Sequence, residues 1–255
     1  MTEYEIYKRC FPASEITSAD FSALTEHGRK FTADGAFAVA CEDRVELICV
    51  APEMKRRGIG SRLLRQCEEY IAENHPAAHI GGKLICGAVS ESAEFFRRHG
   101  YTIGGEFCEM YIDIADYSDT LPPSADTFGF LSGRRDELIA AVNSVDAEWP
   151  QFFDGGDFFC AFGADGKIES FCIVEDDVRC AVSSGKIRTG SVGCVGTVPL
   201  ARGKGTGLKM VSLALEALRR RGCGRCYIHW THLDKWYGKL GARVAFRFRM
   251  AEIEF

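Results

Sequence analysis

Several features of other protein classes are missing from this sequence of 255 residues. It contains no apolar run long enough to cross a membrane, and its first residues do not resemble a signal peptide. It has no excess of basic residues, because the formal net charge is −5 and the pI is about 5.8. This balance argues against nucleic acid or an anionic membrane as the main partner. We therefore expect a cytoplasmic protein in which any anionic ligand is attracted by a local site.

The cysteines do not show the spacing of a disulfide framework or a metal site. Most of the twelve lie inside apolar runs, as Cys49, Cys160 and Cys172 do, and such cysteines are typical small hydrophobic residues of a reduced compartment. Cys223 and Cys226 form a CxxC motif without a second pair. We interpret this motif as a connection from a helix to a strand rather than as a zinc or redox site, and we expect no metal.

A glycine-rich segment occurs twice, at residues 50–61 and 197–208. Each copy follows an apolar run and precedes a stretch with helical periodicity. The two copies match at a constant separation of 147 residues, in Pro52 and Pro199, Lys55 and Arg202, Gly58 and Gly205, and Gly60 and Gly207. A repeat of this length is a whole domain rather than a solenoid unit, and with 46% hydrophobic residues the chain has enough for two cores.

A polar, proline-bearing stretch at residues 117–126 separates the two patterned halves. We expect an N-terminal domain at 1–117, a linker at 118–126 and a C-terminal domain at 127–255. Each half is expected to be an α/β (α+β) domain, with a mixed, mostly antiparallel sheet flanked by helices. The expected strands are 3–9, 36–41, 45–50, 83–89, 106–114, 127–131, 158–162, 168–174, 191–198, 225–230 and 243–253. The expected helices are 18–31, 58–74, 92–99, 136–145, 205–221 and 233–240.

The repeated turn has the chemistry of an anion site. A strand that runs through glycines into a helix leaves backbone N–H groups exposed at the helix N terminus, where the helix dipole adds positive charge. Neither copy is a Walker loop, and neither has the third glycine of a dinucleotide-binding fingerprint. The pattern predicts a pyrophosphate cradle, with a purely structural turn as the alternative.

On these residues the chain resembles the GNAT superfamily of acyl-CoA-dependent N-acetyltransferases, in a tandem two-domain form. The family's pyrophosphate loop, [Q/R]-x-x-G-x-[G/A], is matched by Arg202, Gly205 and Gly207, and by the first copy with Lys55 in place of Gln or Arg. A second landmark, an aromatic residue four positions before a glycine at the end of a short helix, recurs at residues 237–241 and 96–100. The resemblance implies acetyl-CoA as co-substrate.

The resemblance also implies roles for individual residues. Tyr237 would be the general acid that protonates, or at least bonds, the departing CoA thiolate. The strand before the second loop would separate from its neighbour, so that its free backbone groups bind the pantetheine arm and polarise the thioester. The implied cofactor-binding residues are Val195, Gly196, Thr197, Val198, Arg202, Gly203, Lys204, Gly205, Thr206 and Gly207. A possible second cofactor site comprises Lys55, Arg57, Gly58 and Gly60.

The two halves differ at the position of the acid, because the first half has Phe96 where the second has Tyr237. We therefore expect the active site in the C-terminal half, although Glu46 on a strand of the first half keeps a second site open. The family often places a glutamate on the strand at 191–197, and this sequence has none there. The candidates for a general base are Glu175, Asp176, Asp177, His229, His232 and a relayed water.

The sequence predicts an enzyme that transfers an acetyl group from acetyl-CoA to a primary amine of a small molecule or peptide. The alternatives are a non-catalytic acyl-CoA-binding or regulatory module and a structural pair of domains that bind no nucleotide. The acceptor would lie near an aromatic and acidic segment, or this segment would belong to the core or a lid; its members are Trp149, Phe152, Phe153, Asp154 and Asp157.

Overall fold

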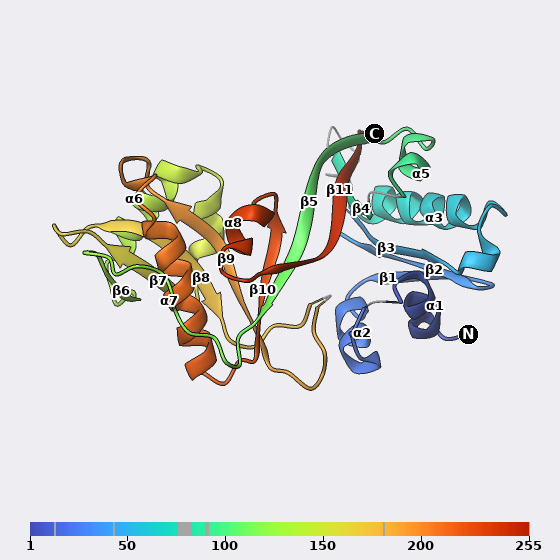
Figure 1. Cartoon of the computed structure of the whole chain (residues 1–255). Coiled ribbons are helices and arrows are strands. Elements are labelled where there is room, and N and C mark those ends of the chain that lie inside the picture. Colours follow the sequence, from blue (N-terminus) through green and yellow to red (C-terminus); the bar gives the residue numbers. More distant parts are fainter. Residues whose placement is uncertain (13, 43, 76–82, 90–91, 181, 255) are drawn as a thin grey trace. The chain divides into compact units, whose positions relative to one another are not determined.

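The chain folds into two compact units (Figure 1). The computed structural model describes residues 1–255 except 13, 43, 76–82, 90–91, 181 and 255, and for residues 83–89 and 254 only the backbone. Unit 1 comprises Met1–Cys108, Arg179–Ser184 and Phe246–Phe255, and unit 2 comprises Glu109–Val178 and Gly185–Ala245. The last residues of the chain thus belong to unit 1, whereas the sequence-based division assigns them to the C-terminal domain. That division stays a prediction.

Unit 1 has helices on both faces of a three-stranded sheet of order β1-β2-β3. Its elements are α1 (Glu3–Cys10), α2 (Ser18–Thr25), β1 (Arg29–Ala33), β2 (Ala36–Cys41), β3 (Arg44–Val50), η1 (Pro52–Met54), α3 (Ile59–Asn74), β4 (Lys83–Val89) and α5 (Ala93–Arg97).

The central strand β2 explains the layers of unit 1. Its alternate residues point to opposite faces. Ala36, Ala38 and Ala40 pack against the apolar side of α3, whereas Phe37 and Val39 pack against α1 and α2. Residues 36–40 are buried, with small side chains on one face and larger ones on the other, and this two-sided burial fixes the register of the strand.

The first helix corrects the sequence-based prediction of a strand at residues 3–9. The aromatic and β-branched residues favour a strand there, but Thr2 and Glu5 form a capping box that starts a helix. The hydroxyl of Thr2 accepts a hydrogen bond from the Glu5 N–H at 3.2 Å, and the Glu5 carboxylate accepts one from the Thr2 N–H at 2.7 Å. The expected helix at 18–31 also ends early, at Thr25, and β1 follows it.

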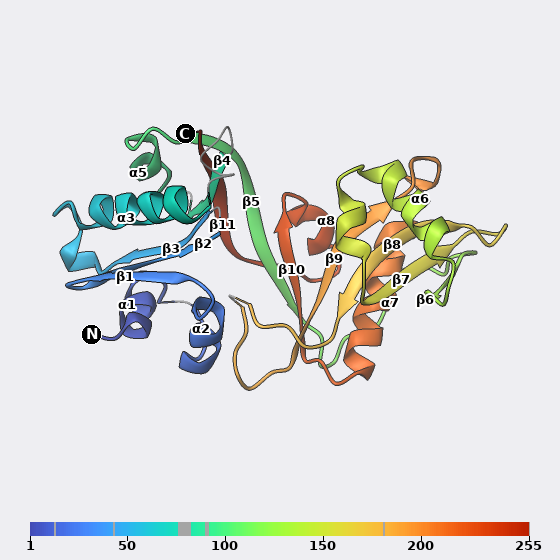
Figure 2. The same cartoon turned by 180° about the vertical axis from the view of Figure 1, so that it is seen from behind.

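Unit 2 carries the second glycine-rich loop. Its elements are β6 (Thr127–Phe130), α6 (Arg135–Val145), η3 (Trp149–Phe153), β7 (Asp157–Phe162), β8 (Ile168–Glu175), β9 (Thr189–Thr197), η4 (Pro199–Ala201), α7 (Thr206–Arg220), β10 (Arg225–Thr231) and α8 (Asp234–Gly238). Figures 1 and 2 show α6 and α7 on opposite faces of the sheet formed by β7, β8 and β9. The core on the α6 side contains Leu138, Val142, Phe153 and Phe171.

Two long strands contribute residues to both units. β5 (Thr102–Asp113) and β11 (Arg243–Glu254) belong to an eight-stranded sheet of order β4-β11-β5-β10-β9-β8-β7-β6. In unit 1 the end of β11 pairs antiparallel with β4, where Phe248 lies opposite Val89 and Glu254 opposite Lys83. In unit 2, β5 is the neighbour of β10. The expected mixed α/β architecture with a helix-flanked sheet is therefore confirmed.

The segment expected to be a linker has no helix or strand, and its first part is bound to α7. The hydroxyl of Tyr117 lies 2.7 Å from Ser212 Oγ, and Asp119 pairs with Lys209 and accepts a hydrogen bond from Ser212 at 2.6 Å. Asp119 is only 11% exposed. The segment therefore forms part of the support of α7.

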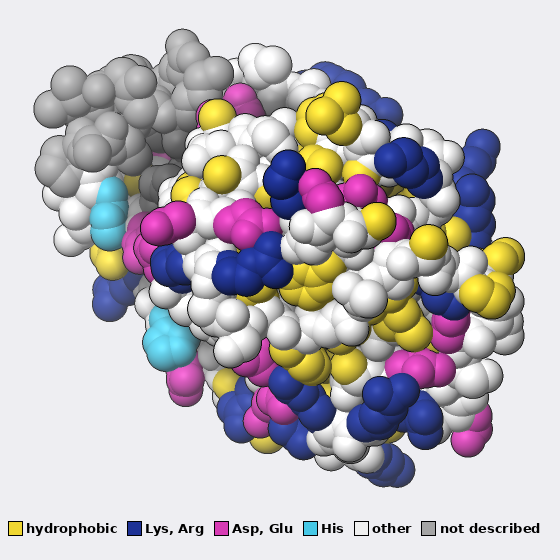
Figure 3. Space-filling model, turned by 90° about the vertical axis from the view of Figure 1, so that its left-hand side faces the viewer, with side chains coloured by type: hydrophobic (Ala, Val, Ile, Leu, Met, Phe, Trp, Pro, Cys, Tyr) yellow, Lys and Arg dark blue, Asp and Glu magenta, His cyan; other side chains and the backbone are white. Residues whose placement is uncertain are grey.

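On the face shown in Figure 3, lysine and arginine side chains alternate with aspartate and glutamate. Among the residues that the structure describes, no helix has the length and apolarity needed to span a bilayer.

Candidate functional site

The loop between β9 and α7 is open above its glycines. Gly203 and Gly205 have φ angles of 80° and 86°, a region that favours glycine, and a Cβ added at either would meet no atom within 4 Å. Gly205 is the N-cap of α7, and in this described stretch no side chain caps the helix. The first turn of α7 therefore begins without a capping side chain, at the positive end of the helix dipole.

Gly207 has a different task in the same loop. A Cβ at this position would lie 2.5 Å from Thr197 Oγ1, the last residue of β9. Thr197 Oγ1 is in turn 2.7 Å from Ser170 Oγ on β8. The second glycine of the motif thus permits close packing of α7 on the sheet, a structural demand that accompanies the anion site.

Of the polar side chains in the loop, some are exposed to solvent and one is buried. Arg202 is exposed, and its Nε donates a hydrogen bond to the Thr197 carbonyl at 3.0 Å. Lys204 is exposed as well. Thr206 is 3% exposed and its hydroxyl donates to Asp126 at 2.8 Å, so that this side chain is used inside the protein. Two cationic side chains remain at the rim of the loop.

β9 and β10 separate just before the loop. Their parallel ladder joins residues 189–192 to 225–228, and β9 then continues to Thr197 beyond it. On its other edge β9 stays paired with β8, although the register shifts between Phe171 and Ile173. The strand bulges there, and Cys194 adopts a φ of 45°. The expected splay of this strand is therefore present. We call the place where β9 and β10 separate the fork; there, the edge of β9 at residues 193–197 is not paired with β10.

The residues expected to bind a cofactor along this edge have distinct surroundings. Val195 lies within the bulge and Gly196 follows it, and a Cβ on Gly196 would lie 2.3 Å from the Phe171 ring. Val198 packs with the core on the α6 side. Across the fork, Trp230 on β10 has a φ of 49° and is 48% exposed. Strained backbone on both sides of the fork is a feature of functional sites.

Tyr237 lies on α8 and is 5% exposed. Its ring contacts Trp236 edge to face, with centroids 4.7 Å apart. Burial raises the pKa of Tyr237 well above its usual value, and the nearby thiols of Cys172, Cys226 and Cys194 add to this. These thiols belong to β8, β10 and β9, so the phenol lies near the two strands that separate and near β8 beside them. The group stays protonated at neutral pH and is a hydrogen-bond donor.

A polar cluster on β5 and β10 escaped the sequence analysis. His229 Nδ1 lies 2.8 Å from a carboxylate oxygen of Glu109 and 2.8 Å from the Tyr227 hydroxyl, which also bonds Glu109. Glu109 is 4% exposed, whereas the His229 side chain is 57% exposed. His229 was one of several candidate bases, but Glu109 is 120 residues away along the chain and no local pattern links the two.

The other candidate bases have different environments. Glu175 accepts a hydrogen bond from Ser191 at 2.9 Å, within the paired part of β9, and Asp176 pairs with Arg188 at 3.2 Å. Asp177 and His232 are exposed. In unit 1, Glu46 is bound to Arg44 at 2.8 Å on an exposed part of β3.

The aromatic and acidic segment does not assemble into one pocket. Phe153 is fully buried in the core beside α6, and Trp149 packs against that core. Phe152 is exposed. Asp154 pairs with Arg135 at 3.1 Å, and Asp157 pairs with Arg221 at 2.6 Å. The core alternative therefore describes Phe153, and the two aspartates are engaged by different arginines.

The first glycine-rich loop repeats the backbone of the second. Gly58, with a φ of 74°, is the N-cap of α3, and a Cβ there would also meet no atom within 4 Å. Lys55 follows a short 3-10 turn, as Arg202 does, and Arg56 takes the left-handed conformation that Gly203 has in unit 2. Arg57 is exposed.

The surroundings of the first loop differ from those of the second. A Cβ on Gly60 would meet the Phe95 ring at 3.4 Å and Val50 at 3.6 Å, which are ordinary or slightly tight contacts. Phe96 is 6% exposed and, unlike Tyr237, carries no hydroxyl. Gly100 and Gly241, which end the two short helices, have φ angles of 87° and 91°. The two short helices thus end in the same way, but one carries Phe96 where the other carries Tyr237.

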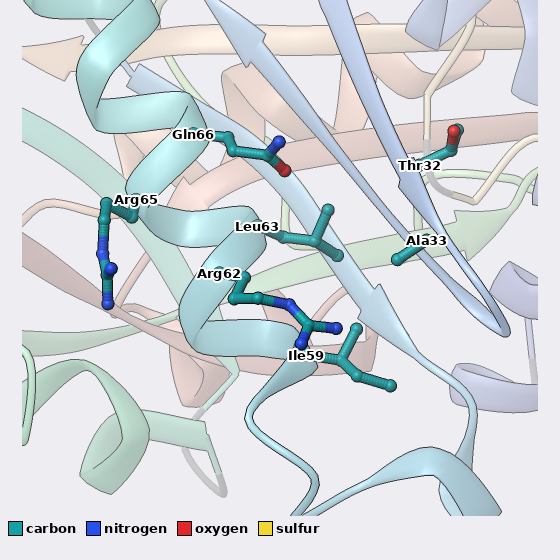
Figure 4. Close-up of a pocket in the computed structure, with 7 residues that line it drawn as sticks. All are labelled: Thr32, Ala33, Ile59, Arg62, Leu63, Arg65 and Gln66. Carbon is teal, nitrogen blue, oxygen red and sulfur yellow. The ribbon is translucent and has the colours of Figure 1, made fainter.

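A cavity of about 300 Å³ lies elsewhere in unit 1, between the first turns of α3 and the end of β1 (Figure 4). Arg62 and Gln66 border it, with Ile59, Leu63 and Ala33 as its apolar wall. It contains none of the glycines of the loops and none of the residues near Tyr237.

Comparison with known proteins finds acetyltransferases. Residues 9–120 match the model of the acetyltransferase (GNAT) domain. A mycothiol acetyltransferase of Geodermatophilus obscurus is 28% identical over 227 residues, which covers 81% of this chain and 69% of that protein. The family match falls on the half with Phe96, whereas the alignment with this relative extends over both halves.

Two solved structures share the fold. The GCN5-related glucosamine N-acetyltransferase region of a fungal multi-domain β-N-acetylglucosaminidase has a TM-score of 0.75 at 17% identity; the match covers 98% of this chain and 36% of the length of the fungal protein. A tandem GNAT protein from the clavulanic acid biosynthesis pathway has a TM-score of 0.58 at 13% identity, over 86% of this chain and 78% of that one. Residues 9–120 are thus similar to an acetyltransferase (GNAT) domain, and the relatives support an N-acetyltransferase.

Proposed function

We propose that this protein is a tandem GNAT enzyme that transfers an acetyl group from acetyl-CoA to a primary amine, with its active site in unit 2. The observation that carries the proposal is the fork between β9 and β10. It has an open helix N terminus at one end and a buried tyrosine beside it. No other part of unit 2 that the structure describes combines an anion cradle, a free strand edge and a protonated donor.

The loop supplies the electrostatics for the pyrophosphate of CoA. Backbone N–H groups at the first turn of α7, the helix dipole, Arg202 and Lys204 all favour an anion there. The open space above Gly203 and Gly205 lets phosphate oxygens reach the backbone. The free edge of β9 at residues 193–197 then offers N–H and C=O groups to the amide-bearing arm of CoA, as in strand addition.

The chemistry requires a donor for the leaving sulfur. Tyr237 has a raised pKa, and a free thiol titrates near about 8.5, so full proton transfer from the phenol to a thiolate is uphill. We therefore assign to Tyr237 a hydrogen bond that stabilises the thiolate as the C–S bond breaks. Phe96 cannot make this bond, which makes unit 1 non-catalytic and leaves its loop, with Lys55, Arg57, Gly58 and Gly60, as a second candidate cradle for CoA.

The test is the variant Tyr237→Phe. A hydrogen bond to a charged group contributes about 1.5–3 kcal/mol, which corresponds to a roughly 10- to 150-fold loss of kcat. The Kd of acetyl-CoA, measured by calorimetry, should stay within about twofold because the phosphate contacts are intact. Tyr70→Phe, on α3 in unit 1, is the matched control. Unchanged turnover in Tyr237→Phe contradicts the assignment.

The alternative is a non-catalytic acyl-CoA-binding or regulatory module. The first loop favours it for unit 1, because a cradle without a donor binds but does not turn over. Binding of CoA by the whole protein without acetyl transfer to any of a broad panel of primary amines would favour this alternative for unit 2 as well.

A further inference from the structure

The strand β10, which forms one side of the fork, carries a histidine just after its last pair with β9. The ladder between β9 and β10 ends at Ile228, and His229 is the next residue. Its side chain is 57% exposed and stands beside the strained Trp230, whose ring lies edge to face with the imidazole at 5.7 Å. His229 is therefore an accessible titratable group at the place where the reacting carbonyl of an acyl thioester would lie if the proposed function holds.

The histidine and Tyr237 face the fork from opposite sides of the sheet. Successive side chains of a strand alternate between its faces. Cys226, on β10, is close enough to Tyr237 to affect its pKa, whereas Tyr227 and His229 share the other face with Glu109. The side chains of β5 fit this arrangement. Ile112 lies beside Gly241, which follows α8, and Glu109 is three residues away on the same strand, so its side chain points to the opposite face.

The buried carboxylate fixes the tautomer of the histidine. An ionised carboxylate only accepts hydrogen bonds, so the 2.8 Å contact with Glu109 places a proton on His229 Nδ1. The Tyr227 hydroxyl donates to the same carboxylate. Nε2 of the exposed ring then carries the lone pair. A carboxylate behind the ring also stabilises the imidazolium that forms when Nε2 takes a proton, as in other histidine bases.

We propose that His229 is the general base that accepts the proton of the acceptor amine, with Glu109 as its positioning residue. This inference rests on the proposed function. The amine nitrogen forms a bond to the carbonyl carbon while the C–S bond breaks and its electron pair leaves on sulfur. The surplus proton on nitrogen moves to His229 Nε2, and Tyr237 donates a hydrogen bond to the thiolate on the other face. β9 carries no carboxylate at residues 191–197, so the base is supplied by the neighbouring strand.

Other polar groups on this face do not have the same position. Glu175 is held by Ser191, which is opposite Tyr227 in the ladder and so lies before the fork. Glu109 is buried and reaches the acceptor only through His229.

The experiment uses the full chain with acetyl-CoA and four primary amines, ethanolamine, glucosamine, lysine and spermidine, and follows the release of CoA thiol. His229→Gln should lower kcat by about 10²- to 10⁴-fold for each amine that the wild type acetylates, the range expected for a general base. The calorimetric Kd of acetyl-CoA should not change by more than about twofold, since His229 makes no contact with the phosphate cradle. Imidazole should restore part of the kcat of His229→Ala, a rescue that a merely structural role does not give.

Two further variants test the positioning role of Glu109 and control for the loss of a histidine. Glu109→Gln should lower kcat with little change in the KM of acetyl-CoA, because it leaves the ring in place without the charge behind it. His27→Gln, an exposed histidine 3.3 Å from Glu26 in unit 1, is the matched control and should retain wild-type kcat. The inference is overturned if the wild type acetylates an amine and His229→Gln keeps the wild-type kcat. If only Glu175→Gln loses kcat, the general base is Glu175 instead. A wild type that acetylates none of the four amines and also fails to bind acetyl-CoA refutes the proposed function, and the inference falls with it.

Discussion

Gly207 and Gly60 occupy the same position in the two loops but have different neighbours, and this difference has a measurable cost. Substitution by alanine at either glycine gains about 0.5–1 kcal/mol of helix stability. At Gly60 the new methyl group meets its nearest atoms at 3.4–3.6 Å, so the gain should survive. At Gly207 the methyl group would stand 2.5 Å from Thr197 Oγ1, and Thr197 must rotate and lose its bond to Ser170.

Overpacking of this kind costs about 1–3 kcal/mol, and the lost hydrogen bond adds about 1 kcal/mol. Gly207→Ala should therefore lower the free energy of unfolding by about 1–3 kcal/mol, while Gly60→Ala leaves it unchanged or raises it. Urea titrations followed by circular dichroism measure both variants. In a Thr197→Ala background the cost of Gly207→Ala should shrink, because the clashing oxygen is gone. Equal stabilities of Gly60→Ala and Gly207→Ala would refute this account of the second glycine.

Two other expectations follow from the titratable groups. Burial raises the pKa of Asp119, but its hydrogen bonds with Lys209 and Ser212 outweigh this and hold the pKa below the usual value near 3.8. The carboxylate therefore stabilises the fold above that value, and Asp119→Asn should be destabilised at pH 7, with the difference from wild type shrinking in melts as the pH falls below about 3.8. A hydrogen bond with Cys49 lowers the pKa of Cys10 to about 7 against the opposing effect of burial, so iodoacetamide at pH 7 should label half-buried Cys10 before the buried thiols, and more slowly in Cys49→Ala.

Local patterns in the sequence predicted the parts of the site that lie close together in the chain. The glycines at 58 and 205 indicated a turn that opens a helix, and in the structure each is the N-cap of one, in the left-handed conformation. The glycines at 100 and 241 likewise end short helices. These features depend on backbone conformations that one residue type favours, so a single sequence can reveal them.

Features that depend on distant residues were not predictable in this way. The sequence does not indicate that the end of β11 pairs with β4, because strand partners far apart carry no local signal. The contact between Glu109 and His229 was missed for the same reason. The helix α1 stands where residue types favour a strand, although its capping box, Thr2 and Glu5, is visible in the sequence. Its aromatic and β-branched residues favour a strand, and the cap is the better signal.

The central claim is that the loop before α7 binds acetyl-CoA, and Gly205→Asp tests it most directly. Aspartate tolerates the left-handed conformation, so the fold should survive, but its charge would stand in the cradle. Gly166→Asp, at a turn glycine with a φ of 76° and equally open space, is the control. By calorimetry, Gly205→Asp should weaken acetyl-CoA binding at least about tenfold, the effect of about 1.4 kcal/mol, while Gly166→Asp binds as the wild type does. Wild-type affinity in Gly205→Asp would contradict the claim.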